Sequence, residues 1–135
     1  MSSKAVLTLP AMMERLNEIT GFIESTLLDE AVEGPDIYPV RLAVDEICTN
    51  IFSYSRARVV TVVVETTQTD LRVTISDDGI PFNPLTVPPP DLDVGIDERE
   101  PGGLGIHLVR NCLDDLSYDY QKGKNILRMV RRRDK

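Results

Sequence analysis

Residues 42–50 read Leu-Ala-Val-Asp-Glu-Ile-Cys-Thr-Asn, and they organise the interpretation of the whole chain. Apolar residues recur through and around this stretch at spacings of three and four, namely Val40, Val44, Ile47 and Ile51. This pattern predicts a helix with one apolar stripe. Glu46 and Asn50 are four residues apart, so they project from one side of that helix, one turn from each other. The amide oxygen of Asn50 can ligate Mg²⁺, and the carboxylate of Glu46 can orient or deprotonate a hydroxyl. The alternative is the polar rim of an amphipathic helix.

The composition is that of one globular domain. A length of 135 residues suffices for one hydrophobic core but not for two. Hydrophobic residues make up 41% of the chain and charged residues 27%, which is ordinary for a globular protein. The net charge of −7 argues against nucleic acid or an anionic membrane as a partner. Neither a signal peptide nor a long apolar run is found, so we expect a cytoplasmic location.

The cysteine, histidine and arginine residues restrict the kinds of site that the chain is expected to form. Cys48 and Cys112 lie among apolar residues in helical patterns, which predicts small core residues instead of a disulfide or a metal site. The single histidine, His107, argues against a histidine metal cluster or a Ser/His/Asp triad. The basic stretch 128–135 is predicted to be a solvated end, with a docking patch for an acidic partner as the alternative.

The order of the predicted elements favours a two-layer fold. Strands are expected at 4–9, 59–66, 71–76, 116–121 and 125–131, and helices at 11–31, 37–54 and 106–115. Short polar links at 67–70 and 122–124 predict two antiparallel hairpins, and Gly34-Pro35 is expected to end the first helix. A steady alternation of strand and helix is absent. We therefore predict a single α/β domain, a two-layer sandwich of a mixed, mainly antiparallel sheet with helices on one face.

Residues 81–101 form a long connection that contains six of the nine prolines. Proline at this density excludes a regular element of the core. A connection of this length inside a compact domain is typical of a functional loop or lid.

Three polar or glycine-rich segments are compatible with one nucleotide site: the Glu46/Asn50 pair, Asp77-x-Gly79 at a strand end, and Gly102-Gly103-Leu104-Gly105 at a helix start. Each alone has an ordinary interpretation as a helix rim, a turn or a tight loop. Together, glycines at a helix N-terminus would bind phosphates, Asp77 would accept a hydrogen bond from an amine such as adenine N6, and Asn50 would hold Mg²⁺. The sequence Gly-Lys-Ser/Thr of a Walker A loop does not occur.

The three segments resemble the sequence boxes of the GHKL ATPase superfamily, which includes DNA gyrase, heat-shock ATPases and histidine kinases. Glu46-x-x-x-Asn50 resembles the N box, Asp77-x-Gly79 the first glycine box, and Gly102-Gly103-Leu104-Gly105 the second. Over nearly all 135 residues the chain is most similar to the small, single-domain anti-sigma factor serine kinases of bacteria, whose N box reads much like AVDEICTN.

This resemblance implies the Bergerat (GHKL) fold, with 81–101 as the ATP lid, and an ATP- and Mg²⁺-dependent protein serine/threonine kinase. Glu46 would be the general base that activates a serine hydroxyl, and Asn50 the Mg²⁺ ligand. Asp77 would recognise adenine, with Gly79 giving the ring room. The remaining implied nucleotide contacts are Arg99, Gly102, Gly103, Leu104 and Gly105, of which Gly103 and Gly105 would line the triphosphate.

The resemblance also implies partners. Such kinases bind a sigma factor and phosphorylate a serine of a STAS-domain antagonist, an anti-anti-sigma protein that would otherwise displace it. Because members of this subfamily form homodimers, self-association is left open, although the sequence has no separate dimer signature.

Two departures from the family pattern keep other functions open. Tyr54 stands where the family often has a histidine, and Glu100-Pro101 stands where relatives often have a basic residue, with Arg99 the nearest candidate. Loss of a cation would weaken catalysis more than binding, because the cation stabilises the charge of the transition state. The alternative function is a non-catalytic module that sequesters its partner in a nucleotide-dependent way. A histidine kinase fragment is a third option, disfavoured because no dimerisation helix with a phosphoacceptor histidine precedes the domain.

Overall fold

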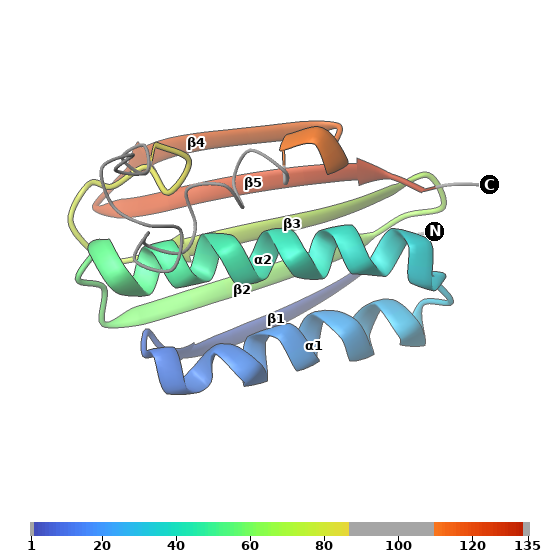
Figure 1. The fold of residues 1–135 in the computed structure, drawn as a ribbon, viewed down its shortest axis with the longest axis horizontal. Helices are drawn as coiled ribbons and strands as arrows, with labels where there is room; N and C mark the ends of the chain where they lie inside the picture. Colours follow the sequence, from blue (N-terminus) through green and yellow to red (C-terminus); the bar gives the residue numbers. More distant parts are fainter. Residues whose placement is uncertain (1, 87–109, 134–135) are drawn as a thin grey trace, which may run out of the picture.

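The computed structural model describes residues 2–86 and 110–133, which fold around one five-stranded sheet (Figure 1). The strands are β1 (Ser3–Pro10), β2 (Val59–Thr66), β3 (Asp70–Asp77), β4 (Asp115–Gln121) and β5 (Lys124–Arg132). Their order in the sheet is β1-β2-β3-β5-β4. The sequence predicted a mixed, mainly antiparallel sheet, and all the pairings between these strands are antiparallel.

Both predicted hairpins are present, β2 with β3 and β4 with β5. In the second hairpin the two turn residues, Lys122 and Gly123, have φ angles of 52° and 77°. Two central residues with positive φ are typical of a type I′ turn, whose twist matches that of the flanking strands. The turn therefore fixes the register of β5 beside β4.

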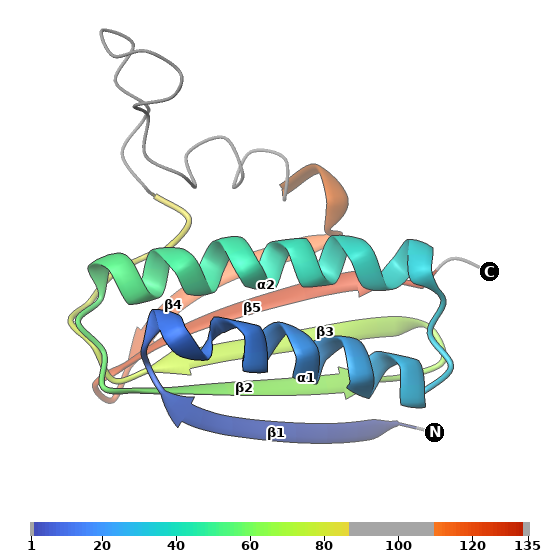
Figure 2. The same ribbon diagram turned by 60° about the horizontal axis from the view of Figure 1, so that its bottom comes forward.

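Two helices, α1 (Leu16–Asp29) and α2 (Gly34–Tyr54), lie side by side on the same face of the sheet (Figure 2). A short 3-10 helix, η1 (Met13–Arg15), precedes α1. Of the helix predicted over 106–115, residues 106–109 lie outside the described residues and 110–112 are helical. Its predicted end is wrong, because the Asp114 N–H donates to the carbonyl of Val130 in β5 at 2.8 Å and Asp115 already begins β4. The arrangement confirms the two-layer α/β fold.

The boundaries predicted for the first two helices need correction. Met12 is extended, with φ −133° and ψ 140°, so no helix begins at Ala11. At the other end, Ala31 has a φ of 59°, and the Val32 N–H donates to the carbonyl of Leu27 at 3.0 Å. This is the hydrogen bond of a Schellman motif, which ends α1 before Ala31. Gly34-Pro35 does not end α1 but forms the first turn of α2, where proline is well tolerated.

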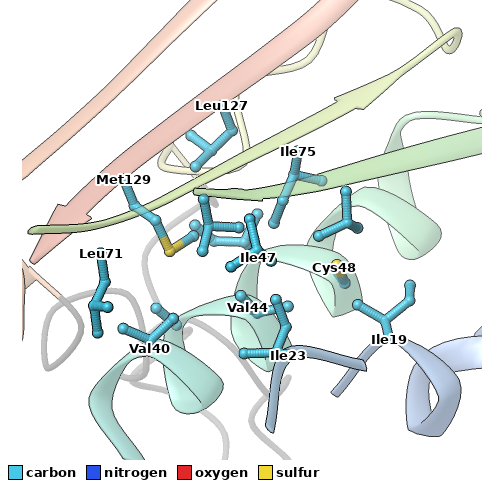
Figure 3. Close-up of a cluster of buried hydrophobic side chains, with 14 of the residues drawn as sticks. Ile19, Ile23, Val40, Val44, Ile47, Cys48, Leu71, Ile75, Leu127 and Met129 are labelled. Atoms are coloured by element: carbon cyan, nitrogen blue, oxygen red, sulfur yellow. The ribbon is translucent and has the colours of Figure 1, made fainter. Parts of the chain in front are cut away.

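The core lies between the two helices and the sheet (Figure 3). The predicted stripe of α2 is buried, and side chains from α1 and from β3 and β5 point toward it. Along β2 and β3 every second residue is buried, as expected for strands with one covered face. Full burial of an isoleucine, leucine or valine stabilises the fold by about 1.5–3 kcal/mol. The same stripe holds α2 against the sheet and so fixes the direction of Glu46 and Asn50.

Arg131 of β5 holds the beginning of α2. Pro39 lies inside the helix and has no N–H to donate to the carbonyl of Pro35, four residues earlier. The Arg131 guanidinium donates to that carbonyl at 3.3 Å, to Asp36 Oδ1 at 3.1 Å and to the carbonyl of Cys112 at 2.7 Å. The predicted solvated end of the chain therefore contains, at Arg131, a structural link between β5 and α2.

Both cysteines are free thiols. Cys48 is fully buried, and this burial strongly raises the pKa of its thiol, as expected for a small core residue. Cys112 is partly buried. In the described part of the chain, no helix combines the length and the apolar character needed to cross a membrane.

Candidate nucleotide site

Helix α2 places Glu46 and Asn50 at different depths. Asn50 is buried, with 1% of its surface exposed, whereas Glu46 is partly exposed. Burial raises the pKa of the Glu46 carboxyl, and the neighbouring charge of Asp45 raises it further. A raised pKa makes a carboxylate a better proton acceptor and brings it closer to the pH at which a base must work. This environment is compatible with the predicted role of Glu46 as a general base, which stays a prediction.

The side-chain amide of Asn50 is oriented by the backbone. Its Nδ2 donates to the carbonyl of Pro84 at 3.2 Å, so Oδ1 faces away from this carbonyl and is left as an acceptor. An amide oxygen is a suitable ligand for Mg²⁺. In residues 2–86 and 110–133, no group of three or more His, Cys, Asp or Glu residues is placed to hold a metal ion. In many nucleotide sites Mg²⁺ is bound by one or two protein oxygens and by phosphates and water.

Asp77, the last residue of β3, carries a buried oxygen that can accept a hydrogen bond. Its Oδ1 accepts from the Gly79 N–H at 2.8 Å and from Asn125 Nδ2 at 3.0 Å. Its Oδ2 is buried and has no hydrogen-bond partner among the described residues. Buried polar atoms are nearly always paired, so a lone acceptor of this kind needs an explanation. A donor on a ligand, such as the amino group of adenine, would supply the missing partner.

Gly79 packs against the end of α2. A Cβ atom at this position would lie 2.2 Å from the carbonyl oxygen of Ser55 and 2.8 Å from its carbonyl carbon. The next N–H, of Ile80, donates to the same oxygen at 2.8 Å. The contact with Ser55 is therefore a sufficient reason for glycine here. The role first expected of Gly79, giving room to an adenine ring, stays a prediction.

Residues 81–84, which begin the predicted lid, are held by side chains of α2 and β5. Phe82 packs its ring against Tyr54 with the centroids 5.5 Å apart, and its N–H donates to Asn125 Oδ1 at 2.9 Å. Pro84 accepts the hydrogen bond from Asn50. This segment therefore contacts helix α2 directly and is linked to the end of β3 through Asn125 of β5. Residues 87–101 of the predicted lid lie outside the described residues, as do the predicted nucleotide contacts Arg99, Gly102, Gly103, Leu104 and Gly105.

Sequence reasoning missed Asn125. It follows the turn 122–124 and was taken only as the first residue of a strand. In the structure it is 2% exposed and stands opposite Asp77 in the pairing of β3 with β5. An asparagine at an inward-facing strand position was the available signal, because a buried amide needs partners.

Asp78, the residue after Asp77, makes the stability of the fold depend on pH. Hydrogen bonds from the backbone N–H groups of Val59 and Arg58, at 3.0 and 2.8 Å, lower the pKa of its carboxyl. A folded-state pKa below the unfolded value stabilises the fold above the unfolded pKa of about 3.9. This contribution is lost as the pH falls through the folded-state pKa. Asp78→Asn should therefore lose stability relative to wild type at pH 7, and the difference should shrink below about pH 4.

Urea unfolding of both proteins between pH 7 and pH 3 measures this difference. Asp29→Asn, the same change at an exposed carboxylate at the end of α1, is the matched control. Parallel pH profiles for wild type and Asp78→Asn would show that the two backbone contacts do not depend on the carboxylate charge.

The sequence is similar to those of bacterial protein kinases. The chain is 27% identical over 99 residues to a serine-protein kinase RsbW of Bacillus mycoides, covering 68% of this chain and 62% of the relative. It is also 27% identical over 97 residues to the serine/threonine-protein kinase BtrW of Bordetella bronchiseptica, covering 69% of this chain and 68% of the relative. The match spans about three fifths of the length of the RsbW relative.

A solved structure shares the fold. The RsbU and RsbW domains of a Mycobacterium tuberculosis protein superpose with a TM-score of 0.64, covering 97% of this chain and 32% of that chain. The sequence identity is 13%, so this likeness supports the fold alone. The sequence model of the histidine kinase-like ATPase domain matches residues 9–131, which include Glu46, Asn50 and Asp77. By this match over most of its length, the chain belongs to the histidine kinase-like ATPase domain family.

Proposed function

We propose that this protein binds ATP with Mg²⁺ and transfers the γ-phosphoryl group to a serine hydroxyl of a protein substrate. The observation that carries the proposal is the buried Oδ2 of Asp77, an acceptor without a partner among the described residues. The names of the relatives, serine-protein kinase and serine/threonine-protein kinase, support the same chemistry.

Each described site residue has a separate task in this proposal. Asp77 accepts a hydrogen bond from the adenine amino group through Oδ2. Asn50 holds the cation through Oδ1, because its Nδ2 is engaged by Pro84. Bound Mg²⁺ would neutralise charge on the phosphates. Glu46, partly buried and with a raised pKa, accepts the proton of the substrate serine. Phosphoryl transfer depends mainly on positioning and charge neutralisation, so this small set of groups suffices.

The proposed partners follow from the resemblance to anti-sigma factor kinases. The substrate serine would belong to a STAS-domain anti-anti-sigma protein, and the protein held in check would be a sigma factor. Both interactions, a cytoplasmic location and self-association are part of the proposal. Binding of nucleic acid or a membrane is not, because the net charge of −7 opposes it.

Calorimetric titration with ATP, with and without Mg²⁺, tests the site. A hydrogen bond to a charged group contributes about 1.5–3 kcal/mol, so Asp77→Asn should weaken ATP binding about 10- to 100-fold in both conditions. Asn50→Ala should remove the gain in affinity that Mg²⁺ gives wild type and leave metal-free binding nearly unchanged.

Two variants match these changes outside the site. Asp29→Asn makes the same substitution at an exposed carboxylate at the end of α1, and Asn17→Ala removes an exposed amide from the same helix. Both should bind ATP as wild type does. Absence of ATP binding by wild type with Mg²⁺ would refute the proposed function.

A non-catalytic, nucleotide-dependent binding module is the second candidate. One observation favours it: Tyr54, which stands where the family often has a histidine, packs against Phe82. Incubation of the protein with a STAS-domain partner and Mg²⁺-ATP, followed by intact-mass measurement, separates the two candidates. Phosphoserine on the partner supports the kinase, whereas stoichiometric binding without any mass change supports the module.

A further inference from the structure

Asn125 is fully engaged by the surroundings of Asp77. Its Nδ2 donates to Asp77 Oδ1 at 3.0 Å and to the carbonyl of Ile80 at 2.7 Å. Its Oδ1 accepts from the Phe82 N–H at 2.9 Å and from the Tyr118 hydroxyl. A carboxamide has two donors and two acceptor positions, so all four are used.

This set of partners allows only one orientation of the amide. If the amide were turned over, its oxygen would face the Asp77 carboxylate and the Ile80 carbonyl, and its NH₂ group would face the Phe82 N–H. Acceptor would meet acceptor and donor would meet donor. Burial of Tyr118 raises the pKa of its hydroxyl, which remains a donor at neutral pH. The orientation of Asn125 is thus determined by four groups from different parts of the chain.

The fixed amide determines which oxygen of Asp77 is available. Asn125 and the Gly79 N–H both bind Oδ1, and Oδ2 is the oxygen without a partner among the described residues. Without the donor from Asn125, the carboxylate would keep a single hydrogen bond and could rotate about χ2, a broad torsion. The direction of the free acceptor would then no longer be unique.

We propose that Asn125 is a positioning residue for base recognition: it orients Asp77 so that Oδ2 selects a base with an amino group over one with a carbonyl group. This inference rests on the proposed function. Adenine presents an N6 amino donor, whereas hypoxanthine presents an oxygen acceptor at the same place. An oriented carboxylate oxygen accepts from the first and repels the second. A carboxylate free to turn distinguishes them less well.

The test compares the affinities of Mg²⁺-ATP and Mg²⁺-ITP, two nucleotides that differ at this position of the base. We expect wild type to prefer ATP about 10- to 100-fold, the range given by one hydrogen bond to a charged group. Asn125→Ala should reduce this preference at least about fivefold, mainly through weaker ATP binding. A residue that only supported the fold would change both affinities in the same proportion, so the ratio separates positioning from general structural support.

Two further variants complete the test. Tyr118→Phe removes one partner of Asn125 but keeps the donor to Asp77, so it should retain the preference of wild type. Asn125→Ser, which keeps a small polar side chain, replaces Asn125→Ala in the comparison if circular dichroism shows that the alanine variant does not fold. A wild-type preference that survives in the folded Asn125 variant overturns this inference and leaves the proposed function standing. If wild type binds ATP and ITP equally, adenine recognition by Asp77 fails, and this inference fails with it.

Discussion

Glu46→Gln should lower the rate of phosphoryl transfer about 10²- to 10⁴-fold, the usual contribution of a general base. ATP affinity should change little, because Glu46 acts on the attacking hydroxyl and not on the nucleotide. The variant should also fold at least as well as wild type. Its carboxyl has a folded-state pKa above the unfolded value, so the ionised form is disfavoured in the fold at neutral pH. The measurement is the rate at which a STAS-domain partner gains phosphoserine from Mg²⁺-ATP, followed by intact mass.

Asp45→Asn is the matched control for this change. It removes the same charge one residue away and should keep a transfer rate near that of wild type. Because the charge of Asp45 raises the pKa of Glu46, this variant should also move the acidic limb of the pH–rate profile to lower pH. Unchanged transfer by Glu46→Gln would exclude Glu46 as the base, whatever the control shows.

Gly79→Ala should cost about 3 kcal/mol of unfolding free energy, at the upper end of the usual range for overpacking. The added Cβ would lie 2.2 Å from the carbonyl oxygen of Ser55, a buried residue at the end of α2. A flexible side chain could move aside, but this contact is with backbone that also accepts the Ile80 N–H. Relief would therefore require the turn after β3 to shift away from α2. Such a shift would break the contact that places Asp77 beside the helix, so ATP binding should weaken as well.

Gly21→Ala provides the opposite control, because a Cβ at Gly21 would meet no atom within 4 Å. Gly21 is exposed inside α1, where alanine stabilises a helix by roughly 0.5–1 kcal/mol relative to glycine. Urea unfolding of the two variants should thus give shifts of opposite sign. A Gly79→Ala protein as stable as wild type would disprove the close packing between the turn and α2.

The elements that the sequence predicted well are those with a local periodic signal. The apolar stripe of α2, with Val40 and Ile47, is buried as its spacing predicted. In β2 and β3 every second residue is buried, so the first hairpin has one face covered by the core. The helix boundaries were less accurate. Alanine rarely adopts positive φ, so Ala31, which follows the end of α1, was not recognisable as the residue that takes the place of a glycine cap. Gly34-Pro35 could equally end one helix or begin the next, and only the structure decides.

Of the candidate site, the sequence predicted the residues that are close together in the chain but not the one that strand pairing brings in. Glu46 and Asn50 are on one helix, so their spacing alone puts them on one side. Asn125 interacts with Asp77 across 48 residues of sequence, and this contact depends on the register between β3 and β5. A shift of the register by one residue would turn Asn125 to the other face. Its role could therefore not be found before the pairing of the strands was known.

Arg131 is synthesised well after the helix whose first turn it contacts. It follows Asp36 by 95 residues, and at about 5–20 residues per second the ribosome needs about 5–20 seconds to add them. During that time α2 lacks the Arg131 guanidinium. This group donates to the Pro35 carbonyl, which Pro39 leaves without its helical hydrogen bond. A chain whose synthesis stops before β5 would contain Glu46, Asn50 and Asp77 but would lack the strand that holds the start of α2, the helix of Glu46 and Asn50. Translation products that stop before β5 should therefore bind the proposed ligand poorly.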